Sequence, residues 1–131
     1  MTELSGHCLC GAVRFKVRGA VRTAGHCHCE SCRRAASSPV TSFFTVERAD
    51  ASLSGDSLRF YASSPGVRRG FCSDCGSPMS FETERRPSEI DFYVASLDDG
   101  QSVAIGEHWH WNERVDWLNI VDDLPKGEGG A

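Results

Sequence analysis

Residues 6–15 read GHCLCGAVRF, where a turn with Cys8 and Cys10 runs directly into an alternation of apolar and basic side chains. A second stretch, FCSDCG at residues 71–76, also ends in a cysteine followed by a glycine. Structural zinc prefers four thiolates in a tetrahedron, normally two from each of two short turns. A glycine behind the last cysteine can take a positive φ, so the turn can close around the metal. The two turns predict one closed zinc site, with the ligands Cys8, Cys10, Cys72 and Cys75.

Such a site would join the N-terminal strand to the middle of the chain. Structural zinc contributes roughly 10–16 kcal/mol of apparent binding free energy in small peptides. Four unligated buried cysteines are the simplest alternative, but they explain neither the spacing nor the glycines. A thioredoxin-like role for Cys72 and Cys75 requires a βαβ context, which the surrounding sequence lacks.

Three cysteines remain in the stretch GHCHCESCRRAASSP at residues 25–39, and an odd number of thiols cannot pair off among themselves. Three thiolates around zinc with an open fourth position form the pattern of a catalytic site, because that position accepts water or a substrate atom. These candidate catalytic and metal-binding residues are Cys27, Cys29 and Cys32. The alternative is a second closed site, whose fourth ligand would be His7, His26, His28, His108 or His110.

The neighbours of these three cysteines leave their own alternatives open. Adjacent residues in an extended turn point in opposite directions, so His28 is expected to face away from the metal. Arg33 and Arg34 either bind an anionic substrate through two-pronged hydrogen bonds or lie in solvent on a short helix. No residue stands out as a general base, and His26 and His28 are the nearest candidates.

The composition is that of one ordinary domain of 131 residues, with 40% hydrophobic and 24% charged residues. A net charge of −4 with dispersed basic residues argues against nucleic-acid binding, which needs a basic face. The sequence has neither the start of a signal peptide nor an apolar stretch long enough to cross a membrane. We therefore expect a cytoplasmic protein whose thiols stay reduced, with an exported disulfide scaffold as the alternative.

Short alternating segments predict an all-β domain of two packed sheets. Val13, Phe15 and Val17 alternate with basic residues, and a similar alternation recurs over residues 90–94. Turn sequences separate further short strand candidates. These are residues 42–46, 58–61, 67–71 and 79–81.

One short helix is expected over Glu30–Ala36, with Ser31 as its cap and Pro39 beyond its end. The domain is expected to occupy residues 1–121. Residues 122–131 are polar and rich in glycine, which predicts a flexible tail.

Four stretches resemble the glutathione-dependent formaldehyde-activating enzyme family, which includes centromere protein V. They are GHCLCGAVRF (6–15), CHCESCRR (27–34), FCSDCGSPM (71–79) and HWHWNERVDWLNIVDDLP (108–125). The stretches span nearly the whole chain in order, and seven cysteines at this spacing are highly specific. The resemblance implies an Mss4-like, zinc-stapled β-sandwich with two zinc ions per chain. It places a structural zinc on Cys8, Cys10, Cys72 and Cys75, and a second zinc, facing substrate, on Cys27, Cys29 and Cys32.

The resemblance also implies an activity. The implied activity is that of a carbon–sulfur lyase of the S-(hydroxymethyl)glutathione synthase type. Such an enzyme joins glutathione or a similar small thiol to formaldehyde or another aldehyde. A non-catalytic zinc module that binds a protein, or a thiol or metal sensor, remains the alternative. The family pattern predicts a glycine shortly after the paired arginines, where this chain reads Ala35-Ala36-Ser37-Ser38-Pro39.

Overall fold

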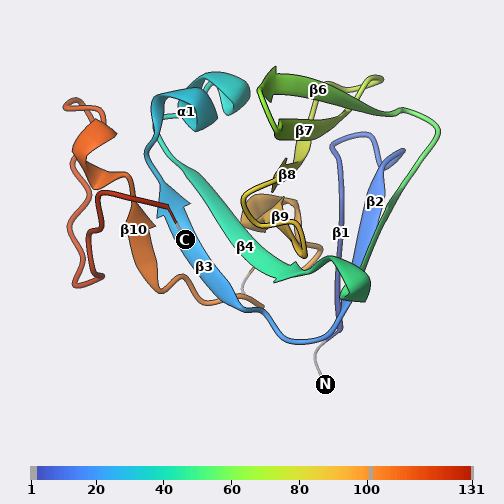
Figure 1. Cartoon of the computed structure of the whole chain (residues 1–131), viewed down its shortest axis with the longest axis horizontal. Coiled ribbons are helices and arrows are strands. Elements are labelled where there is room, and N and C mark those ends of the chain that lie inside the picture. Colours follow the sequence, from blue (N-terminus) through green and yellow to red (C-terminus); the bar gives the residue numbers. More distant parts are fainter. Residues whose placement is uncertain (1–2, 101, 131) are drawn as a thin grey trace.

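The structure, a computed structural model, describes residues 3–100 and 102–130 (Figure 1). Within these residues two sheets are present. The smaller sheet has the strand order β1 (Glu3–His7), β2 (Arg14–Arg18), β5 (Ala51–Ser54). The larger sheet has the order β10 (Glu107–Trp109), β3 (Thr23–Cys27), β4 (Thr41–Glu47), β9 (Glu89–Tyr93), β8 (Pro78–Thr83), β7 (Val67–Cys72), β6 (Leu58–Ser64). All neighbouring strands are antiparallel except β10 and β3, which are parallel.

The two sheets pack face to face through aromatic side chains. Phe15 of β2 stacks on Phe92 of β9 with ring centroids 4.4 Å apart, and Phe44 of β4 packs against both rings. All three side chains are almost completely removed from solvent. The predicted all-β sandwich is therefore confirmed, and its core lies between the small sheet and the centre of the large one.

The central strands β4 and β9 are buried on both faces. Because successive side chains of a strand point to opposite faces, Phe43 faces away from the core that holds Phe44. Phe43 packs instead against Tyr93, with ring centroids 4.4 Å apart, in a second apolar cluster that includes Trp109. This second face of the large sheet carries the candidate site described below.

The strands predicted from alternation are present as β2, β4, β6, β7, β8 and β9. Several strand ends differ from the prediction by one to three residues, and Val94 begins a short 3-10 turn rather than continuing β9. Strands β1, β3, β5 and β10 were not predicted. Strand β3 reads TAGHC and lacks alternation, since both of its faces are covered. At Gly25 a Cβ atom would lie 2.4 Å from Cε2 of Trp109, so the glycine lets that ring lie on the strand.

The helix α1 (Glu30–Ala36) has the predicted bounds but a different cap. The N-terminal cap is Cys29 rather than Ser31, and the Cys29 Sγ accepts the backbone N–H of Cys32 at 3.4 Å. At the other end Ser37 adopts the left-handed conformation with φ 49°. Ser37 falls within the stretch 35–39 in which the family pattern predicts a glycine, the residue that takes this conformation most easily.

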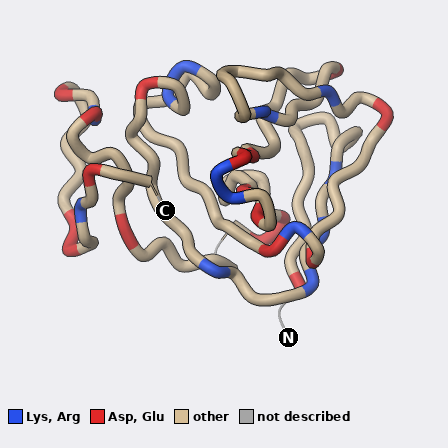
Figure 2. The backbone as a smooth tube through the Cα atoms, in the orientation of Figure 1, with Lys and Arg blue, Asp and Glu red and all other residues tan. Residues whose placement is uncertain are grey.

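The C-terminal residues run beside β10. The backbone N–H of His108 donates to the carbonyl of Pro125 at 2.8 Å, and the N–H of Gly127 donates to the carbonyl of His108 at 3.0 Å. The flexibility of this tail stays a prediction. Figure 2 shows basic and acidic residues interspersed over the fold. In the part of the chain that the structure describes, no helix is long and apolar enough to cross a membrane.

Candidate metal centres and active site

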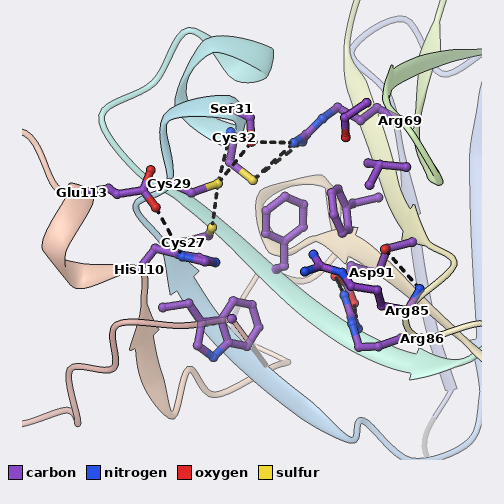
Figure 3. A pocket seen from close by; sticks show the side chains of 17 residues that line it. Cys27, Cys29, Ser31, Cys32, Arg69, Arg85, Arg86, Asp91, His110 and Glu113 are labelled. Atoms are coloured by element: carbon purple, nitrogen blue, oxygen red, sulfur yellow. Dashed lines mark hydrogen bonds and ion pairs between the residues drawn. The ribbon is translucent and has the colours of Figure 1, made fainter.

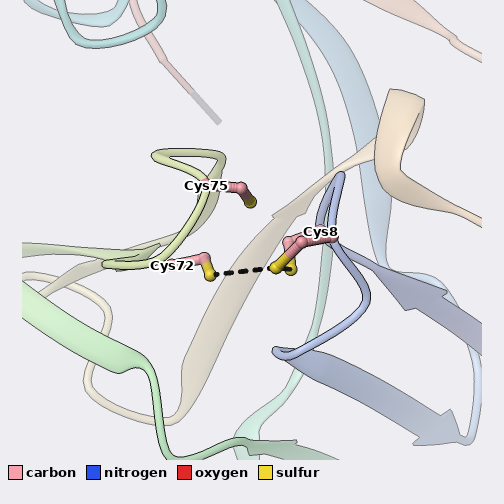
Figure 4. Close-up of side chains that lie close together, drawn as sticks. Cys8, Cys72 and Cys75 are labelled. Atoms are coloured by element: carbon pink, nitrogen blue, oxygen red, sulfur yellow. Dashed lines mark hydrogen bonds between the residues drawn. The ribbon is translucent and has the colours of Figure 1, made fainter.

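The first cysteine cluster, here called the four-cysteine site, joins the β1–β2 turn to the turn after β7 (Figure 4). The sulfur of Cys10 lies 3.7 Å from the sulfur of Cys8 and 3.7 Å from that of Cys72. With Cys75, the four sulfurs lie within 4.8 Å of one another. A tetrahedron with metal–sulfur bonds of about 2.3 Å has sulfur–sulfur edges of about 3.8 Å. The predicted four residues are therefore brought together at a spacing that fits zinc.

The backbone of both turns favours metal binding. Gly11 and Gly76 have φ values of 83° and 81°, the positive values expected behind the last cysteine of each turn. The backbone N–H of Val13 donates to the Cys8 sulfur at 3.3 Å. Hydrogen bonds from Ser77 lower the pKa of Cys75 to about 5. Such donors stabilise thiolates, the form in which cysteine binds a metal.

The second cluster, the three-cysteine site, gathers Cys27 at the end of β3, Cys29 at the helix cap and Cys32 in α1. The sulfurs of Cys27 and Cys29 are 3.5 Å apart. Hydrogen bonds from Cys27 and Cys32 lower the pKa of Cys29, whereas the bond that Cys27 donates to Cys29 raises the pKa of Cys27. Negative charges on three converging sulfurs repel one another, so a bound cation would stabilise all three thiolates. The site can hold a metal ion.

No histidine or carboxylate joins the three sulfurs within 4.8 Å in the described ranges 3–100 and 102–130. His28 faces away from them, as predicted, and its Nε2 lies 2.8 Å from Nδ1 of His108. His26 contacts the hydroxyl of Ser42 at 2.7 Å. Neither His26 nor His28 lines the pocket beside the sulfurs, so the structure does not support either as the general base. The histidine that does line it is His110.

The three sulfurs open into a pocket of about 540 Å³, here called the three-cysteine pocket (Figure 3). One wall is apolar and comes from strands β4, β8 and β10. Its residues are Phe43, Phe81 and Trp109. A second wall is basic and carries Arg69, Arg85 and Arg86. Because β4 and β9 are buried on both faces, the large sheet can carry this pocket on the face opposite the main core.

The arginines of the pocket are not those that the sequence singled out. Arg33 donates to the carbonyl of His28 at 3.1 Å, and Arg34 donates to the carboxylate of Glu30 at 2.9 Å. Neither side chain lines the pocket, and both form hydrogen bonds within or beside α1 instead. In the sequence the pocket arginines belong to the pairs Arg68-Arg69 and Arg85-Arg86. Consecutive residues of a strand point to opposite faces, and this was the only sequence signal that one residue of the first pair would face the pocket.

These arginines have different partners. Arg86 forms an ion pair with Asp91 at 2.8 Å, and this pair raises the pKa of Arg86. Arg69 is buried and donates to the sulfur of Cys32 at 3.6 and 3.7 Å. Burial is the largest single influence and lowers the pKa of Arg69, but the charge and hydrogen bond of Cys32, with smaller contributions from Tyr93 and Cys29, together raise it above its usual value. Arg85 is exposed and has no ion-pair partner among the residues that the structure describes.

His110 and Glu113 form the edge of the pocket next to Cys27 (Figure 3). Nδ1 of His110 lies 3.4 Å from a carboxylate oxygen of Glu113. That carboxylate also accepts the backbone N–H of Glu30 at 3.0 Å, which connects this edge to the start of α1. His110 has a left-handed backbone with φ 55°, a strained conformation of the kind that persists at functional sites. The pair is suited to proton transfer beside the sulfurs.

The fold and site define a β-sandwich with two cysteine clusters that can hold metal ions, one of which opens into a pocket with an apolar wall and a basic wall. The chain belongs to the glutathione-dependent formaldehyde-activating enzyme family, which it matches over residues 3–113. It is 36% identical over 81 residues to an uncharacterized lyase of Schizosaccharomyces pombe, a match that covers 62% of this chain and 58% of that protein.

The fold also resembles the crystal structure of a Rhodobacter sphaeroides protein determined by structural genomics. The TM-score is 0.61 at 26% sequence identity, with 72% of this chain and 88% of that chain covered.

Proposed function

We propose that this protein is a lyase-type enzyme that forms and breaks a carbon–sulfur bond between a small thiol, such as glutathione, and formaldehyde or another aldehyde. Family membership and the similarity to a lyase support this proposal. The observation that carries it is the convergence of three cysteine sulfurs on a pocket in which no described side chain offers a fourth ligand.

Zinc is the metal that we propose for both clusters. The four-cysteine site would hold a structural ion, and Cys27, Cys29 and Cys32 would hold a catalytic one. When bound by three sulfurs, zinc supplies a positive charge and an open position for a substrate sulfur or oxygen. The sulfur spacing and the thiolate-stabilising donors described above support this choice over a site for magnesium or calcium, which prefer oxygen ligands.

The pocket residues have separate roles in this proposal. Phe43, Phe81 and Trp109 exclude water from the reacting atoms. Arg85, whose guanidinium lacks a partner in the described chain, binds a carboxylate of the thiol substrate. The carboxylates of glutathione make it a suitable ligand for this side chain.

Bond formation moves one proton. The thiol loses its proton, its sulfur forms a bond to the carbonyl carbon, and the carbonyl oxygen gains a proton as its π bond breaks. His110 holds this proton between the two steps, and Glu113 orients the imidazole through their 3.4 Å contact. The reverse sequence releases the thiol and the aldehyde, so the same residues serve both directions.

A second candidate function is a module that binds a protein partner. Exposed apolar side chains support it, because Trp117, which lies beside Arg33 and Arg34 of α1, is 73% exposed, and Leu118 and Val121 are 38% and 85% exposed. This function does not require the three-cysteine site to accept a small thiol, so one experiment separates the two candidates.

The experiment replaces zinc with cobalt and titrates the protein with glutathione. Each added thiolate ligand increases the charge-transfer absorbance, so glutathione should raise this band and release about one proton per thiol bound. S-Methylglutathione, which cannot form a thiolate, is the matched control and should do neither. In parallel, exchange NMR should show that the zinc protein accelerates formation of the glutathione–formaldehyde adduct, and that Cys29→Ser does not. An unchanged spectrum together with an unaccelerated exchange would reject the enzyme in favour of the binding module.

A further inference from the structure

Arg69 is a buried cation without a carboxylate partner. Only 7% of the residue is exposed, and no carboxylate lies within ion-pair distance of it in the described part of the chain. Its guanidinium donates to the hydroxyls of Ser31 and Ser63, each at 3.3 Å. Both terminal nitrogens also donate to the sulfur of Cys32, at 3.6 and 3.7 Å (Figure 3).

Buried charges in proteins are almost always paired, because an isolated ion loses its hydration without compensation. Arg86, on the same wall of the pocket, follows this rule through Asp91 and Glu89. Hydroxyl groups carry no net charge and cannot balance Arg69. The negative charge that compensates Arg69 must therefore come from the cysteine sulfurs.

The geometry of β7 directs this one arginine at the sulfurs. Arg69 extends across the face of Phe81, 4.9 Å from its ring centroid, towards α1. Its neighbour Arg68 points to the opposite side of the strand, where it stacks on Phe60 at 3.9 Å and pairs with Glu82. Figure 1 shows the β6–β7 hairpin at the same end of the large sheet as α1, which makes the contact between them possible.

We propose that Arg69 is the counter-ion of the three-cysteine site, a positioning residue that balances the negative charge of the sulfurs when they hold zinc. This inference rests on the proposed function. Three thiolates outweigh the two positive charges of a zinc ion, and an anionic substrate sulfur adds a further negative charge to the same buried place. Arg69 compensates for this excess and thereby increases the affinity of the site for zinc and for anionic ligands over neutral ones.

The test measures zinc affinity at the two sites of the same molecule by competition with a chromophoric chelator. Partners that contact metal ligands typically change metal affinity by about 10–100-fold when they are removed. Arg69→Gln should therefore weaken zinc binding at the three-cysteine site by about that factor and leave the four-cysteine site unchanged. Arg68→Gln, the same substitution one residue away, is the matched control and should change neither. Arg69→Lys, which keeps the charge, should recover most of the lost affinity.

A second measurement applies even if Arg69→Gln folds poorly in the native background. In Cys32→Ser the sulfur beside Arg69 is gone and the guanidinium is left without its compensating charge. Adding Arg69→Gln to this variant should raise its Tm by a few degrees. A lower Tm in the double variant would mean that Arg69 acts only through packing and hydrogen bonds.

The possible outcomes distinguish a failure of this inference from a failure of the proposed function on which it rests. Equal zinc affinities for Arg69→Gln and Arg68→Gln would overturn the inference alone. If Arg69→Lys bound zinc at the three-cysteine site as weakly as Arg69→Gln, the proposal that Arg69 acts through its charge would be overturned. A native chain that holds zinc only at the four-cysteine site would overturn the proposed function and the inference together.

Discussion

The Nε2 atom of His28 lies 2.8 Å from Nδ1 of His108, on the side of the cysteine loop that faces away from the three-cysteine pocket. Nε2 of His108 in turn lies 2.8 Å from a carboxylate oxygen of Asp122. The carboxylate accepts the Nε2 proton of His108, so we assign Nδ1 of His108 as the acceptor of the Nε2 proton of His28. Burial lowers the pKa of His28 to about 4, which keeps this histidine neutral near pH 7. A hydrogen-bonded chain, buried at its two histidines, therefore connects the three-cysteine site to Asp122 in the C-terminal tail.

Asp122 is expected to hold this tail on β10. The hydrogen bond from His108 lowers the pKa of Asp122 to about 2. Because a lowered carboxyl pKa stabilises the folded contact above the ordinary value, the contact is complete above about pH 4 and is lost as the pH falls through about 2. Asp122→Asn should accelerate hydrogen exchange of the His108 and Gly127 amides at neutral pH. Asp123→Asn is the control, and equal exchange in both variants would exclude this role for Asp122.

The two cysteine clusters are expected to differ in their effect on stability. Cys8→Ser or Cys75→Ser removes a ligand from the site that joins two distant turns, so either variant should unfold or aggregate. Cys29→Ser should keep the fold and lose one of the two zinc ions expected per chain. Thermal melting and elemental analysis of the variants, purified without chelator, check both points. Equal melting of the two classes, or one zinc ion in the native protein, would contradict the division.

Ser37→Gly should stabilise the protein. Ser37 has φ 49° at the end of α1, a conformation that costs a non-glycine residue roughly 1–2 kcal/mol. Glycine removes this cost but adds about 0.4–1 kcal/mol of conformational entropy to the unfolded chain. The net gain should be about 0.5–1 kcal/mol in the free energy of unfolding, measured by denaturant titration. Ser38→Gly is the control and should not stabilise, because Ser38 has an ordinary negative φ and its hydroxyl donates to Val40.

Gly25→Ala should displace the ring of Trp109, which forms part of the apolar wall of the pocket. The new Cβ would lie 2.4 Å from Cε2 of Trp109, so the ring or the strand must move. Overpacking of this kind costs about 1–3 kcal/mol. Tryptophan fluorescence and denaturant unfolding should show both changes. Gly106→Ala, whose Cβ would approach the Ala24 carbonyl oxygen only to 3.8 Å, should leave both measurements near their native values.

Arg85→Gln should weaken the binding of anionic thiols selectively. Because Arg85 is expected to contact a remote carboxylate rather than the reacting atoms, KM for glutathione should rise about tenfold while kcat changes little. Activity with 2-mercaptoethanol, which has no carboxylate, should be unaffected. Arg34→Gln, on the outer side of α1, is the control. An equal loss with both thiols would show that Arg85 acts on the chemical step or on the fold.

The sequence by itself determined the features that depend on neighbouring residues. The seven cysteines could be divided into four and three from the sequence. The spacing of ligands within each turn and the glycines that follow two of the turns, Gly11 and Gly76, both of which take positive φ, were sufficient. Alternation over Val13, Phe15 and Val17 identified β2, because one side of that strand is buried and the other is exposed.

The tertiary structure alone decided the remaining chemistry of the pocket. Arg69 reaches Cys32 across 37 positions in the chain, and no local pattern encodes that contact. Strand β3 has no alternation to detect, because Trp109 covers one face of it at Gly25. His110, rather than His26 or His28, lines the pocket because the parallel pairing of β10 with β3 places its end beside Cys27. Residues distant in sequence meet only when the strands pair, so their roles follow from the sheet and not from spacing.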